Sequence, residues 1–174
     1  MKFPFTRQHD AMDCGPACLK MVAEHYGRHY SLEMLRESTS IGREGMSLLG
    51  ISRAAEKIGM RTIGGRITFE DLKEKAPLPC IVHWNQNHFV VVYGVKGKKV
   101  FVADPGKGLT TYTRETFCEH WLSTSAKGED KGIALLLEPT RLFYANEGEV
   151  APERNNLKFL SGYFKPYRRY FLQL

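Results

Sequence analysis

Apolar residues recur every three to four positions in the first half of the chain, the spacing of one face of an α-helix. The clearest such segment begins at Cys14, with Asp13 in the position of an N-cap and Gly27 at the C-terminal stop. The pattern predicts helices over residues 14–26, 31–37, 47–58 and 69–75, the last of them beginning after a capping box at Thr68 and Asp71.

From about residue 80 the pattern changes to short runs that are rich in β-branched and aromatic residues. The strongest is HFVVVYGV at 88–95, and a turn around Gly97 separates it from VFVAD at 100–104. Helices that come first and antiparallel strands that follow predict an α+β domain, with N-terminal helices packed on an antiparallel β-sheet. The predicted strands cover residues 80–84, 88–95, 100–104, 109–113 and 133–138, and a short helix capped by Thr113 extends to Trp121.

The end of the chain has a different composition, which predicts a division into a domain at 1–145, a polar linker at 146–156 and a basic amphipathic segment at 157–174. The last segment, LKFLSGYFKPYRRYFLQL, suits a helix on a membrane surface, with aromatic rings at the depth of the headgroups and basic groups over phosphates. A helix packed on the domain is an equal alternative. The apolar end of the segment predicts that the chain continues into a longer protein.

Composition is that of a soluble globular domain, because 43% of the 174 residues are hydrophobic and 25% are charged. The net charge of +6 is concentrated near the C-terminus, which leaves a net of only +2 over residues 1–150. The sequence therefore gives little reason to expect nucleic-acid binding. The basic residues of 151–174 are Arg154, Lys158, Lys165, Arg168 and Arg169.

No cofactor or metal is expected from the sequence. The N-terminus lacks the apolar core of a secretion signal, so the four cysteines are expected to be reduced. No CxxC pair is accompanied by a second CxxC or by HxxxH, as a structural zinc site would require. The loop Gly106-Lys107-Gly108 lacks the Walker pattern of a phosphate site. No apolar run reaches the length of a membrane-spanning helix.

Cys14 is the candidate nucleophile. Most cysteines are small buried hydrophobes, and we assign Cys18 and Cys80 to this class, leaving Cys118 open. Cys14 differs because it lies at the predicted start of a helix, where the helix dipole favours a thiolate. Gly15 allows a substrate backbone to approach. The Gln8 amide, together with the backbone N–H of Cys14, is placed to donate to an oxyanion.

His88 is the candidate base among six histidines. It begins one predicted strand and Asp104 ends the next, so a tight hairpin sets the two side by side, within about one position of register. A carboxylate beside a histidine fixes the tautomer and orients the ring. His83 has no comparable partner, and a polar residue with satisfied hydrogen bonds is the default for the remaining histidines.

These residues resemble a known family. The chain is similar to the C39 peptidases over about residues 3–144. The similarity is carried by Gln8, by CGPAC from Cys14, by HFVVVYG from His88 and by VADPGKG, which contains Asp104. The C39 peptidases are papain-like cysteine peptidase domains at the N-terminus of bacteriocin-exporting, peptidase-containing ABC transporters. All four family positions (Gln8, Cys14, His88 and Asp104) carry the expected residue types.

The resemblance implies a papain-like fold and cleavage of a leader peptide directly after a Gly-Gly, Gly-Ala or Gly-Ser pair. It implies that a groove binds the leader as an amphipathic helix. It also implies a transmembrane domain and a nucleotide-binding domain outside this chain, and a location at the cytoplasmic face of the bacterial inner membrane. The segment from Leu157 resembles the membrane-surface helix that precedes the first transmembrane helix of such transporters.

Two other functions remain open from the sequence. One is a catalytically silent, C39-like module that binds a leader and does not cut it, which the presence of both Cys14 and His88 disfavours. The other is an acyltransferase with the same Cys-His-Asp set, which the spacing of Gln8 and Cys14 and the C-terminal segment disfavour.

Overall fold

The computed structural model describes residues 2–39, 47–126 and 129–145. Its first part is helical: a short 3-10 helix η1 (Ala11–Asp13) leads into α1 (Cys14–His25), followed by α2 (Leu32–Ser38) and α3 (Leu48–Lys57). Local capping explains where α2 and α3 begin, because Ser31 accepts a hydrogen bond from the backbone of Met34, and Ser47 accepts one from Gly50. These helices confirm the predicted ones to within a residue or two.

The prediction that Asp13 caps α1 is wrong in one respect. Asp13 occupies the N-cap position, but its side chain makes no capping hydrogen bond. That function is performed one turn earlier by Asp10, which caps η1 and accepts a hydrogen bond from Met12. Gly27 has φ of 82°, the left-handed conformation that glycine tolerates at a helix C-terminus.

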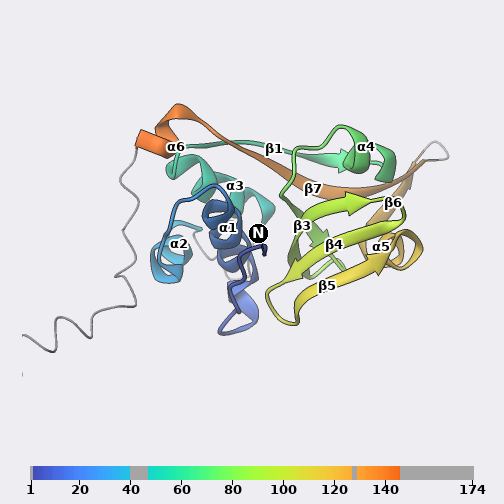
Figure 1. Ribbon diagram of the computed structural model, residues 1–174, viewed down its shortest axis with the longest axis horizontal. Helices are drawn as coiled ribbons and strands as arrows, with labels where there is room; N and C mark the ends of the chain where they lie inside the picture. The colour runs from blue at the N-terminus through green and yellow to red at the C-terminus, as the bar shows by residue number, and fades with distance from the viewer. Residues whose placement is uncertain (1, 40–46, 127–128, 146–174) are drawn as a thin grey trace, which may run out of the picture.

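Seven antiparallel strands form one sheet, which confirms the predicted α+β class. The spatial order is β1-β7-β2-β3-β4-β5, with β6 paired to β7. In Figure 1, the helices α1–α3 lie at one end of the long strands β1 and β7, and the remaining strands lie at the other. The strands are β1 (Met60–Ile67), β2 (Cys80–Trp84), β3 (His88–Lys96), β4 (Lys99–Asp104), β5 (Gly108–Thr113), β6 (Leu122–Ala126) and β7 (Glu129–Pro139).

The sequence pattern missed β1 and β6. The prediction that the four N-terminal helices precede the first strand is therefore wrong, because β1 comes before the helix that follows Thr68. Residues of β1 are mostly exposed, and the pair Gly64-Gly65 interrupts any apolar alternation. Its strand conformation comes from pairing with β7, from Met60 opposite Pro139 to Ile67 opposite Gly132. Three helices complete the described chain: α4 (Phe69–Glu74), α5 (Arg114–Trp121) and α6 (Arg141–Ala145).

The sheet separates two apolar cores, because successive side chains of a strand point to opposite faces. Odd-numbered residues of the central strands pack with α1–α3, and even-numbered residues pack with α4 and α5. The odd-numbered set includes Ile81, Phe89, Val91, Ala103 and Leu135. The even-numbered set includes Val82, Trp84, Val90, Val92 and Val102, which share their core with Phe117 and Trp121 of α5. No helix in the described ranges is long and apolar enough to cross a membrane.

Candidate active site

Cys14 is the first residue of α1 and is only 3% exposed. The hydrogen bond from Cys18 Sγ to the backbone oxygen of Phe89, 3.3 Å long, attaches the next turn of α1 to β3. Because Cys18 lies one helical turn after Cys14 and Phe89 follows His88, this contact brings the start of α1 to the start of β3. The thiol of Cys14 thereby reaches the ring of His88, with which it shares a hydrogen bond.

His88 and Asp104 are in direct contact. His88 Nε2 lies 2.9 Å from Asp104 Oδ1, which also accepts a hydrogen bond of 2.8 Å from the backbone N–H of Gly106. Asp104 is buried, with 2% of its surface exposed. With Nε2 bonded to Asp104, Nδ1 is the ring nitrogen left for Cys14.

The environment favours the charged forms of both partners. Burial alone would lower the pKa of His88, but its hydrogen bonds with Asp104 and Cys14 outweigh this effect and raise the pKa to about 9. Burial alone would raise the pKa of Asp104, but the hydrogen bonds from His88 and Gly106 lower it below its usual value. At neutral pH the pair is therefore an imidazolium beside a carboxylate.

The route to this contact differs from the one that the sequence predicted. The register of the β3–β4 hairpin pairs Val91 with Ala103, and continuing it sets Asp104 opposite Val90. Asp104 is thus two positions from His88 rather than within one, and a β-bulge further along the hairpin shifts the pairing. The side chains still meet because positions 88 and 90 share a face and diagonal neighbours are within reach of long side chains.

Gln8 lies beside the same carboxylate. Its backbone N–H donates to the backbone oxygen of Pro105 over 3.0 Å, which attaches the N-terminal segment to the turn after β4. Gln8 Oε1 is buried and has no hydrogen-bond partner among the described residues. A Cβ built on Gly106 would lie 3.8 Å from Gln8 Oε1, so the carboxamide reaches the wall formed by this turn. The carboxamide thus lies at the edge of the cavity that holds His88 and Asp104, where its N–H₂ group is the part able to donate to an oxyanion.

An open cavity of about 440 Å³ lies along these residues. Asn85 and Gln86 both have positive φ and form the tight turn between β2 and β3. The turn is held by α5, because Asn85 bonds His120 through Oδ1 and Nδ1 at 2.8 Å. The lining residues are Gln8, Ala11, Trp84, Asn85, Asn87, His88, Asp104, Gly106 and Lys107.

The sequence analysis did not assign Trp84, Asn85 and Lys107 to the site. The polar run WNQN between two strands was a signal for a turn, but nothing local indicated that this turn forms a wall of the cavity. The assignment depends on which strands pair, and β2 and β4 meet only through β3.

The other cysteines lack the features of a nucleophile. Cys18 and Cys80 are fully buried, as predicted, and burial raises the pKa of Cys80 to about 12. Burial also raises the pKa of Cys118, which is only partly exposed. None of the described His, Cys, Asp and Glu residues forms a cluster of three or more that could hold a metal ion.

Comparison with protein families and curated sequences gives consistent matches. The profile of the peptidase C39 family matches residues 2–129. The lactococcin-G-processing and transport ATP-binding protein LagD of Lactococcus lactis subsp. lactis is 38% identical over 119 residues, 66% of this chain and 17% of its own length. The colicin V secretion/processing ATP-binding protein CvaB of Escherichia coli is 32% identical over 159 residues, 91% of this chain and 21% of its own length. The chain thus spans about a fifth of these relatives.

Solved structures share the fold. A double glycine motif protease from an AMS/PCAT transporter, crystallised with the leader peptide, is 37% identical, with a TM-score of 0.69 over 80% of this chain and 93% of its own. The peptidase domain of Streptococcus ComA, a bifunctional ABC transporter involved in quorum sensing, is 31% identical, with a TM-score of 0.67 over 80% of this chain and 100% of its own.

Proposed function

The chain belongs to the peptidase C39 family, and from this premise we propose that it removes the leader of a secreted peptide by cutting after a Gly-Gly pair. The observation that carries the proposal is the 2.9 Å contact between His88 and Asp104, beside a cysteine at a helix N-terminus. The solved protease that was crystallised with a leader peptide is 37% identical to this chain, which supports the same substrate class here.

In the first chemical step, the Cys14 thiolate attacks the carbonyl carbon of the second Gly. The oxyanion that forms accepts hydrogen bonds from the Gln8 amide and the backbone N–H of Cys14. His88, as imidazolium, then donates its proton to the leaving amine, and the C–N bond breaks. The released product is the mature peptide, and the leader remains as a thioester on Cys14.

Water completes the cycle. His88, now neutral, takes a proton from the water molecule that attacks the thioester carbonyl. The thiolate of Cys14 leaves, the leader departs with a new carboxylate, and the imidazolium is restored. Throughout, Asp104 holds Nε2 of His88 and stabilises the positive charge of the ring. Small residues before the cut bond allow the substrate backbone to approach Cys14 closely.

The leader is proposed to bind as an amphipathic helix in an apolar groove between α3 and the strands β1 and β7. The groove has a volume of about 500 Å³, and Leu49 at its rim is 59% exposed. Apolar side chains on one face of a leader helix would cover this surface, while its polar face stays in water. The lining residues are Leu48, Leu49, Ser52, Gly64, Gly65, Arg66, Ile133 and Leu135.

We place this peptidase domain in a transporter at the cytoplasmic face of the bacterial inner membrane. The support is that the relatives are named as processing and transport ATP-binding proteins, and that this chain matches only 17% and 21% of their length. The domain at 1–145 would cut the leader, and the segment 157–174 would lie on the membrane surface. The linker at 146–156 and that segment lie outside the described residues.

The test is incubation of the protein, and of Cys14→Ala, with a synthetic double-glycine leader peptide, followed by mass spectrometry. We expect the wild-type protein to cut after the Gly pair and add one water, and Cys14→Ala to bind the peptide without cutting it. Binding without cleavage by both proteins would instead indicate a silent leader-binding module. Transfer of the leader to an added amine in place of water would indicate an acyltransferase.

A further inference from the structure

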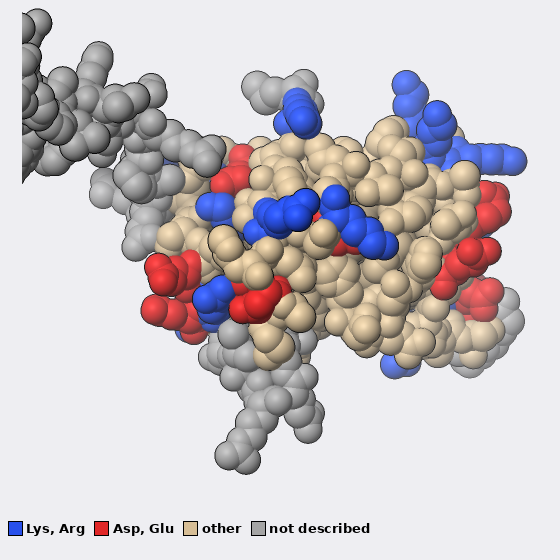
Figure 2. Space-filling model, turned by 90° about the horizontal axis from the view of Figure 1, so that it is seen from below, with Lys and Arg blue, Asp and Glu red and all other residues tan. Residues whose placement is uncertain are grey.

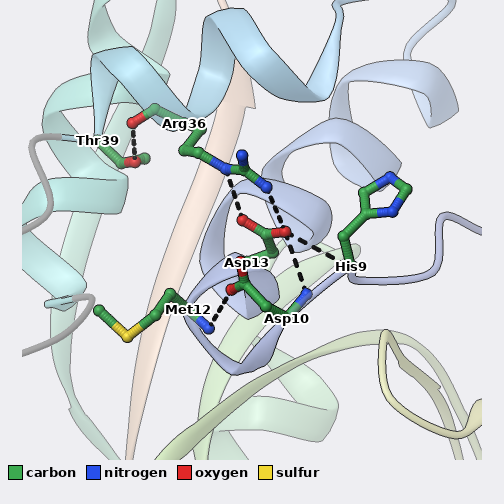
Figure 3. Close-up of polar contacts among 6 residues, drawn as sticks. All are labelled: His9, Asp10, Met12, Asp13, Arg36 and Thr39. Carbon is green, nitrogen blue, oxygen red and sulfur yellow. Dashed lines mark hydrogen bonds and ion pairs between the residues drawn. The ribbon is translucent and has the colours of Figure 1, made fainter.

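The carboxylate of Asp13 is fully buried, although the residue directly precedes the candidate nucleophile (Figure 3). Burying a charge is costly unless it is paired and hydrogen-bonded. Asp13 does not spend its oxygens on the first turn of α1, as an N-cap would. The carboxylate instead closes the capping box of η1 by accepting from the backbone N–H of Asp10, and it also binds groups outside this segment.

Two elements converge on the carboxylate. Arg36 of α2 binds it with two parallel hydrogen bonds, from Nε to Oδ1 at 2.7 Å and from Nη2 to Oδ2 at 2.5 Å. The backbone N–H groups of His9 and Asp10 both donate to Oδ2 at 3.3 Å. Figure 3 shows these donors on opposite sides of Asp13, one from α2 and the others from the segment that follows Gln8.

These contacts turn residues 8–14 into a closed loop. Its first residue, Gln8, is attached to Pro105 beside Asp104, and its last residue is Cys14. The side chain of Asp13, next to Cys14, accepts hydrogen bonds from the backbone of His9 and Asp10, near the start of the loop. Arg36, on the separate helix α2, binds the same carboxylate. The bonds that meet at Asp13 therefore restrict how far the backbone at Gln8 can move relative to Cys14.

We propose that Asp13 and Arg36 are a positioning pair that holds the Gln8 carboxamide at the oxyanion formed on attack by Cys14. The inference rests on the proposed peptidase function and adds residues that touch neither substrate nor the reacting atoms. An oxyanion donor is effective only when it is preorganised, and a misplacement of about 1 Å can cost on the order of 10²-fold in rate. A loop with one end on the donor and the other on the nucleophile supplies that preorganisation.

The charge state of Asp13 supports this function. Burial alone would raise the pKa of Asp13, but the hydrogen bonds and the charge of Arg36 lower it below its usual value. The carboxylate therefore stays ionised at neutral pH and keeps all its acceptors. A neutral amide in its place could not accept at both oxygens from Arg36 and from the backbone.

The experiment is a double-mutant cycle on leader-peptide cleavage. Asp13→Asn and Arg36→Met are made alone and combined with Gln8→Ala, and kcat and KM are measured for each protein. We expect either single change to lower kcat by about 10- to 10²-fold with KM nearly unchanged, because it misplaces a donor and not the leader. In the Gln8→Ala background the same changes should lower kcat little further.

A surface ion pair of similar length is the matched control. Lys75 and Asp71 are 2.8 Å apart at an exposed site on the other core, so Lys75→Met should leave kcat and KM at wild-type values. Thermal melting of every variant is recorded, and kcat is measured well below each midpoint. A merely structural pair would change the midpoint and leave the kcat of folded molecules unchanged.

Three results would overturn the proposal: wild-type kcat in both single variants, a rise in KM alone, or losses that add fully to that of Gln8→Ala. If Asp13→Asn does not fold, the cycle between Arg36→Met and Gln8→Ala decides, because Arg36 is partly exposed. Arg36→Lys keeps the positive charge and should retain part of the rate. If the wild-type protein does not cut the leader peptide, the proposed peptidase function itself is wrong. If the wild-type protein cuts and both single variants have the same kcat, only the proposal of a positioning pair is wrong.

Discussion

At the scale of single residues, the site consists of groups that would be unstable or unreactive alone. The His88 ring is partly buried, yet Asp104 and Cys14 keep it protonated. Cys14 is nearly buried but lies at a helix start, whereas Cys80 is buried in a strand and its pKa is raised to about 12. Of these two cysteines, only Cys14 combines a place at a helix N-terminus with a neighbouring histidine, which is why we propose it as the nucleophile.

Replacing Gln8 by Ala is expected to lower kcat by about 10²–10³-fold, the cost of removing one oxyanion donor from a preorganised site. KM for the leader peptide should change little, since the oxyanion exists only during reaction. Steady-state cleavage of a synthetic leader peptide measures both constants. Lys75→Met at the exposed ion pair with Asp71 is the control, and an unchanged kcat in Gln8→Ala would remove this role.

Replacing Asp104 by Asn is expected to change the pH dependence of cleavage as well as its rate. With a pKa of about 9, His88 remains an imidazolium through neutral pH, so kcat/KM should decline only as pH rises through about 9. Asn removes the charge that raises this pKa, so the alkaline limb should move to lower pH. The rate at neutral pH should also fall, by up to about 10²–10⁴-fold for impaired acid–base catalysis.

A series of kcat/KM measurements between mildly acidic and alkaline pH tests this expectation. Asp71→Asn serves as the control, because Asp71 is paired with Lys75 on the surface and should not affect the profile. An alkaline limb at the same pH in Asp104→Asn and in the wild-type protein would contradict the assignment of His88 as the general acid.

At the scale of helices and strands, the two faces of the sheet pack against different helices. One face packs with α1–α3 and brings the nucleophile helix to β3, while the other packs with α5, which holds the turn at Asn85. The groove proposed for the leader lies between α3 and the strands β1 and β7. In the proposed function, leader binding and bond cleavage depend on different elements, so we expect mutations to separate them.

Replacing Leu49 by Asp is expected to raise KM for the leader peptide at least about 10-fold with kcat nearly unchanged, because burying a charge opposes docking of an apolar helix face. Leu142→Asp is the matched control, since Leu142 is 67% exposed on α6 and outside the groove. Cleavage over a range of leader concentrations separates the two constants. A KM equal to that of the control would place the leader elsewhere.

At the scale of the whole molecule, the described domain and the C-terminal segment differ in charge. On the face seen in Figure 2, small groups of basic and acidic side chains lie close to one another, and broad uncharged surface separates these groups. This face offers no continuous basic surface among the residues drawn in colour. The basic excess of the sequence lies in 151–174. Attraction to anionic lipid is therefore expected from that segment.

Removing residues 146–174 is expected to leave the rate of leader cleavage unchanged and to abolish binding to anionic vesicles. Each Lys or Arg near such a surface contributes about 1 kcal/mol, so the five basic residues of this segment supply most of the attraction. Co-flotation with vesicles of phosphatidylserine and phosphatidylcholine, at low and high salt, measures binding. Equal binding of the shortened chain would assign the membrane contact to the domain.

The sequence by itself determined what depends on neighbours within about one helical turn. The helix that follows Thr68 was predictable because its cap needs only residues a few positions away. The place of Cys14 at a helix start was predictable from the three-to-four spacing of apolar residues, although the expected cap at Asp13 does not form. The strand at 88–96 was evident from its β-branched run. The sequence also predicted that His88 and Asp104 lie near each other on neighbouring strands, but it did not give their exact register.

Only the tertiary structure decided relations between distant segments. The bulge in the β3–β4 hairpin altered the register of Asp104, and pairing with β7 made a strand of the mostly exposed residues of β1. The apparent N-cap Asp13 became the partner of Arg36, 23 residues away, because folding α2 against α1 brought a guanidinium within reach. A carboxylate forms its strongest hydrogen bonds with a charged guanidinium. Whether a guanidinium lies within reach depends on how the helices pack, and not on the local sequence.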